Sequence, residues 1–516
     1  MDKIDFQKGK RKLLRVIFGR TVLLFTALLL QAGILLFFMF KLAGYLTYYY
    51  WVSIVISVIM LIYILNSDIN PSYKLAWGIP VAMFPMFGAL FYLFVHIQPG
   101  GKVIDDRLKV INYDTAGYMK QDPIVLLELE KEDIHLKKFT EYMNNIGPFP
   151  MCKNSDAKFY PLGDDWYPDM LERLKEAREF IFMEFFIVNH GVLWDSVLEI
   201  LKEKAAQGVE VRFMYDGTCT FFRLPHNYPE YLESMGIHCR IFFPIRPALS
   251  TYQNNRDHRK IAVIDGKYAY TGGVNLADEY INKMSRFGHW KDTAVEITGE
   301  AVNTFTMLFL QNWNIQSRET EDVSLYVRDY KVKSEGYIMG YTDSPFDDIK
   351  VGESVYMDIL YTATEYVHIM TPYLILDNEM ITALSYAVKR GVDVKLIMPH
   401  ITDKPYAYMV ARNYYEILLK KGVKIYEYTP GFIHAKEFVS DNKKAVVGSV
   451  NLDYRSLYLN FESAAYLYGV NAVKDAETDF LNTLNQCEEI TLADCRKYSK
   501  IKKTVGKLMW LFSPLM

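Results

Sequence analysis

The chain is poor in cysteine, and the few cysteines that it has are scattered. Its five cysteines, an odd number in 516 residues, form no CxxC pair and have no histidine at zinc-ligand spacing, which argues against a disulfide framework and a structural zinc. An excess of one charge is also missing, because 58 Lys and Arg stand against 61 Asp and Glu. Such a chain has no overall attraction to a polyanion, so we expect no nucleic-acid partner.

The sequence also lacks the motifs of metal-dependent and nucleotide-dependent catalysis. It contains no HExxH, no carboxylates clustered at two-metal spacing and no GxxxxGK[ST] loop, so we expect neither a catalytic metal nor a cofactor. Its length, in contrast, exceeds one ordinary hydrophobic core and predicts two or more domains. An aromatic content of 15% suits contact with a bilayer interface.

The N-terminal part of the chain is typical of a membrane anchor. A basic segment, residues 1–20, carries seven Lys or Arg and two Asp, and the apolar run Thr21 to Phe40 follows at once. About 20 apolar residues span the hydrocarbon core as a helix and are too many for a signal peptide. Two more apolar runs lie at 44–65 and 75–95, where Pro80 and Pro85 should kink the second. We therefore predict a transmembrane anchor of two or three helices over residues 21–96.

The number of spans decides on which side of the membrane the remaining chain lies. The basic segment should stay in the cytoplasm. Three spans would place everything after His96 on the outer face. If Thr21 to Phe40 only lies in the interface, two spans remain and return the chain to the cytoplasm. Both alternatives describe a multi-pass membrane protein.

The rest of the chain contains a duplicated α/β unit. Short β-branched and aromatic runs alternate with amphipathic helical segments, as in βα units around a sheet. Four blocks recur in the same order, pairing 180–188 with 366–376, 208–217 with 391–400, 235–244 with 421–430, and 258–275 with 434–451. We predict a linker over 97–145, a first α/β domain over 146–325, a second over 326–495, and a basic, then apolar, membrane-surface tail over 496–516. Two such halves can face each other and share one site.

The last repeated block carries a histidine and a lysine at fixed spacing in both copies. His258 and Lys260, like His434 and Lys436, are two residues apart in a strand-like run, so their side chains should point to the same face. Each run then reaches an aspartate, Asp265 or Asp441, and ends in small residues followed by asparagine: Gly272, Gly273 and Asn275 in the first copy, Gly448, Ser449 and Asn451 in the second. Small residues would let a bulky anion approach closely.

Two histidines, two lysines and two asparagines that converge predict a phosphodiester site. A neutral imidazole can attack phosphorus to form a phosphohistidine, while a second, protonated imidazole gives its proton to the departing alkoxide. The lysines and asparagines would hold the non-bridging oxygens. A single His-x-Lys carries little weight, but both copies here have the same spacing inside a wider repeat.

The pattern HxKx4Dx6GGxN, present at 258–275 and in GSxN form at 434–451, resembles the signature of the phospholipase D superfamily. The segments NPSYKLAW, NNRDHRKIAVIDG, TPYLILDNEM, PGFIHAKEFVSD and GSVNLDYRSLYLNFE extend a resemblance to the bacterial cardiolipin synthases over nearly the whole chain. The resemblance implies an enzyme of a bacterial cell membrane that transfers a phosphatidyl group between two phosphatidylglycerol molecules, yielding cardiolipin and glycerol. It also implies His258 as the nucleophile and His434 as the general acid.

The carboxylates near the motifs have different expected roles. Asp265 and Asp441 lie seven residues beyond their histidines and would face away from the phosphate; we expect them to hold the motif as hydrogen-bond acceptors, as the superfamily uses them. Asp292 and Glu462 are candidates to accept from an imidazole Nδ1–H, unless they are ordinary surface charges. Glu184, an acid in an apolar run, belongs either to the site or to a salt bridge inside the sheet.

Spacing alone does not distinguish such a transferase from related activities. A phospholipase D would use the same residues with water as acceptor, and a phosphatidylserine synthase would accept serine. A non-catalytic lipid-binding scaffold is the alternative of a different class, but it predicts decay of one motif, and both are intact. The expected partners are a phospholipid substrate and the bilayer.

Overall fold

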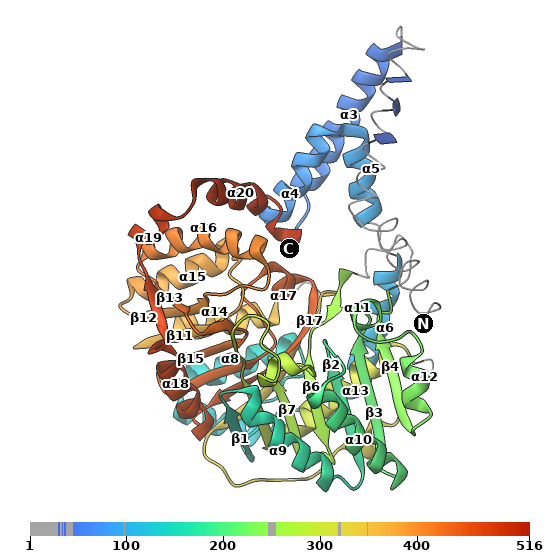
Figure 1. Ribbon diagram of the computed structural model, residues 1–516, viewed down its shortest axis with the longest axis vertical. Helices are drawn as coiled ribbons and strands as arrows, with labels where there is room; N and C mark the ends of the chain where they lie inside the picture. Colours follow the sequence, from blue (N-terminus) through green and yellow to red (C-terminus); the bar gives the residue numbers. More distant parts are fainter. Residues whose placement is uncertain are drawn as a thin grey trace. The chain divides into compact units, whose positions relative to one another are not determined.

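The computed structural model describes residues 45–96, 99–245, 254–317, 321–347 and 349–515, together with 29–30, 33–34 and 36–37. The chain divides into two compact units, residues 1–101 with 246–252 and residues 102–245 with 253–516. Figure 1 labels many of their elements. The basic segment 1–20 and most of the first predicted span, Thr21 to Phe40, lie outside the described residues.

The described part of the first unit is helical, with α3 (Leu46–Leu65), α4 (Pro71–Met83) and α5 (Pro85–His96). Within the described residues, one stretch, Thr47–Leu65 of α3, is long and apolar enough to cross a membrane, judged by length and composition alone. The polar turn between α3 and α4 ends at Asn70, whose side chain accepts from the Ser72 backbone N–H and caps α4.

The apolar run 75–95, expected to form a third, kinked span, is instead a helical hairpin. Helix α4 continues through Pro80 but stops at Phe84, which leaves the helical region (φ −132°, ψ 71°), and Pro85 begins α5. The rings of Trp77 and Phe91 lie 5.5 Å apart, whereas a straight helix would separate them by about 21 Å. The physical reason is Pro85, which disfavours helical geometry at the residue before it and offers no N–H to the preceding turn.

Most of the described part of the segment 97–145, expected to be a linker, is helical. It forms α6 (Pro99–Ala116), α7 (Pro123–Glu132) and α8 (Ile134–Ile146). Two aspartates start the last two helices, because Asp122 accepts from the Ile124 N–H and Asp133 from the N–H groups of His135 and Leu136.

The first repeat builds a mixed seven-stranded sheet in the order β1-β9-β7-β6-β2-β3-β4. Its strands are β1 (Ser155–Tyr160), β2 (Phe180–Phe185), β3 (Glu210–Asp216), β4 (Ile237–Phe242), β6 (Lys260–Ile264), β7 (Tyr268–Gly272) and β9 (Ala294–Gly299). Its helices are α9 (Gly163–Glu176), α10 (Val192–Ala206), α11 (Thr218–Phe222), α12 (Tyr228–Glu233) and α13 (Val302–Ile315).

The second repeat builds a sheet whose strand order, β10-β17-β16-β15-β11-β12-β13-β18, matches the first position by position and adds β18 at the edge. Its strands are β10 (Tyr337–Asp343), β11 (Tyr366–Met370), β12 (Asp393–Pro399), β13 (Lys424–Tyr428), β15 (Glu437–Ser440), β16 (Lys444–Gly448), β17 (Asn460–Tyr468) and β18 (Cys487–Ile490). Its helices are α14 (Val351–Thr362), α15 (Asn378–Lys389), α16 (Pro405–Lys421), α17 (Tyr454–Tyr458), α18 (Asn471–Leu484), α19 (Leu492–Lys497) and α20 (Lys500–Trp510). The predicted duplicated α/β fold is confirmed.

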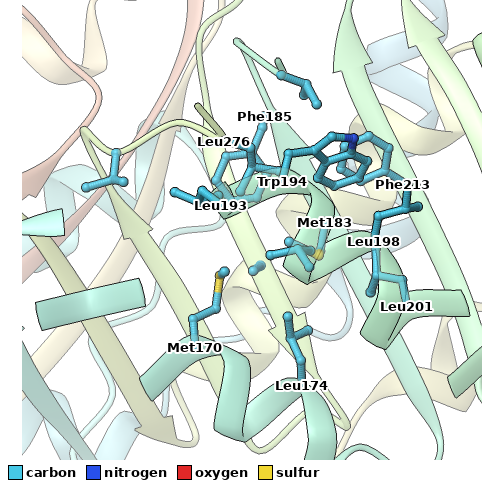
Figure 2. Close-up of a cluster of buried hydrophobic side chains, with 14 of the residues drawn as sticks. Met170, Leu174, Met183, Phe185, Leu193, Trp194, Leu198, Leu201, Phe213 and Leu276 are labelled. Atoms are coloured by element: carbon cyan, nitrogen blue, oxygen red, sulfur yellow. The ribbon is translucent and has the colours of Figure 1, made fainter. Parts of the chain in front are cut away.

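Apolar side chains at helical spacing attach helices to one face of the first sheet. Figure 2 shows Trp194, Leu198 and Leu201 of α10 together with Met183 and Phe213 of the sheet, and all five are buried. The Trp194 and Phe213 rings stack at 4.6 Å. Each such side chain contributes about 1.5–3 kcal/mol when fully buried, so this layer stabilises β2 and β3, and β2 pairs directly with β6, which carries part of the first motif.

Two short strands cross between the repeats. Strand β5 (Arg256–Asp257) pairs in parallel with the start of β17 in the second repeat, and β14 (Gly431–Ile433) pairs in parallel with β8 (His289–Lys291) of the first. Each crossing strand directly precedes a motif histidine. The two repeats are therefore tied together where the predicted chemistry lies.

Candidate active site

The crossing strands place each motif histidine beside a carboxylate of the other repeat. His258 follows β5, and its backbone N–H donates to the carbonyl of the residue before Glu462 (2.9 Å); the Glu462 carboxylate then lies 2.9 Å from His258 Nδ1. His434 follows β14 and donates its N–H to the carbonyl of the residue before Asp292 (2.7 Å). Asp292 Oδ2 lies 2.6 Å from His434 Nδ1. The sequence suggested that each histidine lies inside a continuous strand. The structure instead places each one in the break between two strands.

Burial keeps both imidazoles neutral in the substrate-free protein. Burial lowers the pKa of His258 to about 4, although Glu462 opposes this, and the Lys260 charge lowers it further. Burial is also the first cause that lowers the pKa of His434 well below its ordinary value, with Lys436 adding to it. Because the ionised Glu462 carboxylate only accepts, the hydrogen of His258 is fixed at Nδ1 and its Nε2 lone pair is left available. His434 Nδ1 lies within hydrogen-bond distance of both Asp292 and the Lys436 ammonium, 2.9 Å away.

The two carboxylates differ in their preference for charge. Burial disfavours the charge of Glu462, but His258 and the Ser449 hydroxyl, which donates to it at 2.5 Å, hold the pKa of Glu462 below its ordinary value. Burial raises the pKa of Asp292 to about 7, even though Lys436 opposes the rise. At neutral pH the Glu462–His258 pair holds one proton. The Asp292–His434 pair also holds one proton, and it is close to accepting a second.

The two motif lysines are buried beside their histidines. Burial lowers the pKa of Lys260 to about 7 and that of Lys436 to about 8. The charge of Lys436 contributes to the low pKa of His258, and that of Lys260 to the low pKa of His434. The motifs of the two repeats therefore lie within electrostatic reach of each other.

Asp265 and Asp441 hold the motifs and contact neither histidine. Asp265 accepts from the backbone N–H groups of Arg178, Glu179 and Phe180 at 2.8, 2.8 and 2.9 Å. Asp441 accepts in the same way from Thr364, Glu365 and Tyr366 at 2.7, 3.0 and 2.9 Å. Both aspartates have left-handed backbones, with φ of 53° and 55°. They tie the turn after each motif to the start of the central strand, β2 or β11.

Asp265→Ala is expected to lower the free energy of unfolding by about 3–5 kcal/mol, since three N–H groups lose a charged acceptor and alanine disfavours a left-handed backbone. Denaturant unfolding of the detergent-solubilised protein measures this loss. Asp265→Asn is the control, because asparagine tolerates this backbone and still accepts with one oxygen; it should lose less than half as much. Equal stability of Ala variant and parent would contradict this role.

The asparagines that end the motifs are not equivalent. Asn275 uses both ends of its amide within the protein: Oδ1 accepts from the Ile187 N–H at 2.9 Å, and Nδ2 donates to the Tyr280 hydroxyl at 2.9 Å. One Nδ2 hydrogen has no partner among these contacts, and the expected contact of Asn275 with a phosphate oxygen stays a prediction. Asn451 is buried and its Oδ1 has no hydrogen-bond partner among the described residues.

In each motif, the small residue two positions before the asparagine lies against a carboxylate of the same repeat, and the expected approach of an anion stays a prediction. A Cβ on Gly273 would lie 1.9 Å from Asp292 Oδ1, so only glycine leaves room for this carboxylate. The matching Ser449 instead donates to Glu462. The first motif thus has glycine at position 273, where Asp292 needs the space, and the second has serine at position 449, where the hydroxyl donates to Glu462.

Glu184 belongs to a salt bridge inside the sheet and not to the site. Its carboxylate lies 2.6 Å from the Arg259 guanidinium and accepts from Asn312 Nδ2 at 2.9 Å. The neighbouring His258 contacts Glu462 instead, so the two adjacent side chains have different partners. Of the two alternatives for Glu184, a site role or a salt bridge inside the sheet, the structure shows the salt bridge.

Sequence reasoning missed the aromatic walls around the imidazoles. The His434 ring lies 5.3 Å from Trp290 and 5.4 Å from Tyr280, and the His258 ring lies 5.0 Å from Phe186, measured between centroids. Trp290 lies in the crossing strand β8, Phe186 follows β2, and Tyr280 lies in the 3-10 turn Asp278–Ile281. Nothing in the sequence indicated that these three residues surround the imidazoles. Within the part of the chain that the structure describes, no group of three His, Cys, Asp or Glu side chains is placed to hold a metal.

Comparisons with known families agree with this architecture. The family model described as "Cardiolipin synthase, PLD-like domain" matches residues 170–309 and 356–484, and one described as "Phospholipase D-nuclease N-terminal" matches residues 55–95. The two segments of the first match contain one His-x-Lys motif each.

Relatives align over almost their full length. An uncharacterized protein of Streptococcus mutans is 43% identical and covers 88% of this chain and 99% of its own. A cardiolipin synthase of Alkalihalophilus pseudofirmus is 31% identical over 96% of this chain and 98% of its own. Cardiolipin synthase 2 of Bacillus anthracis is 32% identical over 87% of both chains.

One solved structure supports the fold. The crystal structure of phosphatidylserine synthase from Haemophilus influenzae aligns with a TM-score of 0.55 at 12% identity, and covers 71% of this chain and 97% of its own. At this identity the likeness shows a common fold and does not identify the substrate.

Proposed function

Since the chain belongs to the cardiolipin synthase family with its PLD-like domains, we propose that it transfers a phosphatidyl group from one phosphatidylglycerol to another, giving cardiolipin and glycerol. The observation that carries the mechanism is the crossed arrangement of the site, in which His258 pairs with Glu462 and His434 with Asp292. Two PLD-like domains, over 146–325 and 326–495, would thus share one active site. A lipid-binding scaffold would not need two complete pairs.

In the first step, His258 Nε2 attacks the phosphorus of the donor lipid, and the P–O bond to the glycerol headgroup breaks. His434 gives its proton to the departing alkoxide, so glycerol leaves and the phosphatidyl group stays on His258. Lys260 and Lys436 balance the charge on the non-bridging oxygens. In the second step, the headgroup hydroxyl of another phosphatidylglycerol gives its proton to His434 and attacks phosphorus, and the P–N bond breaks.

The different pKa shifts of Glu462 and Asp292 support the proposed roles of His258 as nucleophile and His434 as general acid. A nucleophile must be neutral with a free Nε2 lone pair, and an ionised Glu462 keeps His258 in that state. A general acid must carry a second proton, and the Asp292 pKa of about 7 lets the Asp292–His434 pair take one up at neutral pH. A bound anionic phosphodiester favours that extra proton.

A direct assay tests the proposed reaction. The full chain in detergent, given phosphatidylglycerol, is expected to release cardiolipin and glycerol in equal amounts. Phosphatidic acid as the main product would establish the hydrolase alternative, and a serine-dependent product would establish a phosphatidylserine synthase. Absence of all three products would contradict the proposal.

We further propose that the chain works at the membrane and that α20 rests on the bilayer surface. Gly506 packs α20 against α16, where an added Cβ would lie 2.3 Å from the Met409 carbonyl. The opposite side carries an apolar stripe that includes Ile501, 78% exposed, and Leu508, 59% exposed. Lysines 500, 502 and 507 lie on the same helix, and an apolar stripe bordered by lysine is typical of helices on anionic membranes.

Glutamate at both Ile501 and Leu508 is expected to slow transfer several-fold in proteoliposomes of phosphatidylglycerol, because apolar contact worth about 1.5–3 kcal/mol per side chain is lost and negative charge is added. The rate in detergent micelles should stay within about two-fold of the parent. Initial rates in the two media measure the difference. Leu481→Glu, at an exposed position of α18, is the matched control. An equal loss in both media would contradict a role in membrane contact.

A further inference from the structure

The helical hairpin α4–α5 is closed tightly about its apex. Gly88 stands where the arms meet, and a Cβ there would lie 2.5 Å from the Pro80 carbonyl oxygen. Three residues further from the apex along each arm, the Trp77 and Phe91 rings are 5.5 Å apart. The pairs 80–88 and 77–91 are both centred on Phe84, so the arms run antiparallel and the chain reverses at that residue.

The hairpin packs along the C-terminal half of α3. The Ser57 hydroxyl donates to the Val81 carbonyl (2.9 Å), and the Tyr63 hydroxyl lies 3.5 Å from His96 Nε2. Helix α4 therefore runs back along α3 from the polar turn 66–70, and α5 returns to the level of Tyr63. We call the end near Tyr63 and the turn 66–70 the foot of the hairpin.

The dimensions decide how deep the hairpin reaches. The apolar stretch of α3 has 19 residues, about 28 Å at 1.5 Å per residue, which matches a hydrocarbon core of about 30 Å. Val81 lies beside Ser57, about 12 Å from the end of α3 at Leu65. The apex at Phe84 is about one helical turn further, so the hairpin extends along roughly half of the span.

The two basic side chains of the hairpin, Lys74 and His96, lie at its foot. Lys74 donates to the Leu65 carbonyl at 3.0 Å, and His96 lies beside Tyr63. The apex, residues 83–87, reads Met-Phe-Pro-Met-Phe. The outward faces are apolar and open, with Met83 66% and Leu90 62% exposed. A hairpin in the core of a soluble protein would cover such side chains, whereas lipid acyl chains fit an apolar surface of this size.

We infer that α4–α5 is a re-entrant hairpin, which enters the hydrocarbon beside α3, turns near the bilayer midplane and leaves on the face where it entered. The chain after His96 then starts on the same membrane face as the turn 66–70. In the described part of this unit, α3 is the one helix that crosses the membrane. If the apolar run 21–40 crosses as its sequence predicts, the basic segment 1–20 and the chain just after His96 lie on the cytoplasmic face. This inference does not rest on the proposed reaction.

Single engineered cysteines in the full chain, expressed in bacterial cells, test the inference. Asp68→Cys probes the turn, Met83→Cys the apex, and Lys120→Cys the chain beyond α6; none of these residues belongs to the proposed catalytic machinery. A membrane-impermeant maleimide is applied to intact cells, to permeabilised cells and to detergent extracts. The unsubstituted protein, whose five cysteines are buried or half-buried, provides the background.

We expect the cysteines at 68 and 120 to be labelled under the same condition, and the cysteine at 83 only in detergent. Labelling of 68 and 120 from opposite faces would show that the run crosses fully and would overturn the inference. Labelling of 83 without detergent would also overturn it. In vesicles of phosphatidylglycerol and phosphatidylcholine, a fluorophore at 83 should be quenched at least two-fold by lipids brominated midway along the chain. Strong disulfide formation between copies at 83 without quenching would assign the apex to a dimer contact and contradict the hairpin's contact with lipid.

Discussion

His258→Ala is expected to lower the rate of cardiolipin formation by at least about 10⁴-fold, because it removes the proposed nucleophile and no other group can form the covalent intermediate. His434→Ala should lower the rate by about 10²–10⁴-fold, since a general acid contributes that much. The two variants should differ in one respect. Given a phosphodiester with a p-nitrophenolate leaving group, which departs without a proton, His434→Ala should recover the first step and accumulate phosphohistidine.

Radiolabelled lipid and acid-labile incorporation into the protein measure this difference. His190→Ala, with a side chain that is 51% exposed, is the control and should keep full activity. If label accumulates on His258→Ala and not on His434→Ala, the two roles are reversed. If neither variant loses activity, the two-histidine mechanism fails.

Glu462→Gln is expected to lower the rate by about 10³–10⁴-fold while leaving the protein folded. The amide of glutamine donates as well as accepts, so it can stabilise the imidazole tautomer that carries its hydrogen on Nε2 and has no lone pair to attack with. Measurement of kcat and KM should place most of the loss in kcat, because Glu462 touches the nucleophile and not the lipid.

The chain offers a matched control for Glu462. Glu477 lies 3.0 Å from Nδ1 of the buried His368, which is the same kind of pair outside the proposed site. Glu477→Gln should leave kcat within about three-fold of the parent and lower only stability. Similar losses of kcat in both variants would mean that Glu462 acts through folding and would refute its proposed role as the group that orients His258.

Much of the site was predictable because its chemistry is local in the sequence. The repeated spacing of His258 with Lys260 and of His434 with Lys436 indicated paired phosphodiester chemistry, and the odd spacing of Asp265 and Asp441 indicated that they face elsewhere. Asp292 and Glu462 were predicted as partners for imidazoles. Which histidine each one contacts was not predictable, because the crossing strands β5 and β14 contain only two and three residues.

Packing gave some of the predicted residues contacts that the sequence did not indicate. Gly273 makes room for Asp292, and Asn275 contacts Ile187 and Tyr280; their contacts with a phosphate stay predictions. Hydropathy predicted a span over 75–95, since averaging over a window does not register a reversal at one residue. The segment 97–145 was expected to be a linker because it lies between the apolar runs and the first repeated block; the structure shows that most of it forms helices α6, α7 and α8.

The sequence by itself determined the duplicated α/β fold, the two His-x-Lys pairs and the apolar character of the N-terminal part, because each is encoded in residue type and short-range spacing. Only the tertiary structure decided that Glu462 serves His258, that Asp292 serves His434, and that the chain reverses at Phe84. The physical reason is that the charge state of a buried histidine depends on neighbours brought from some 140 to 200 residues away. The burial and contacts that fix these neighbours exist only after the two repeats exchange strands.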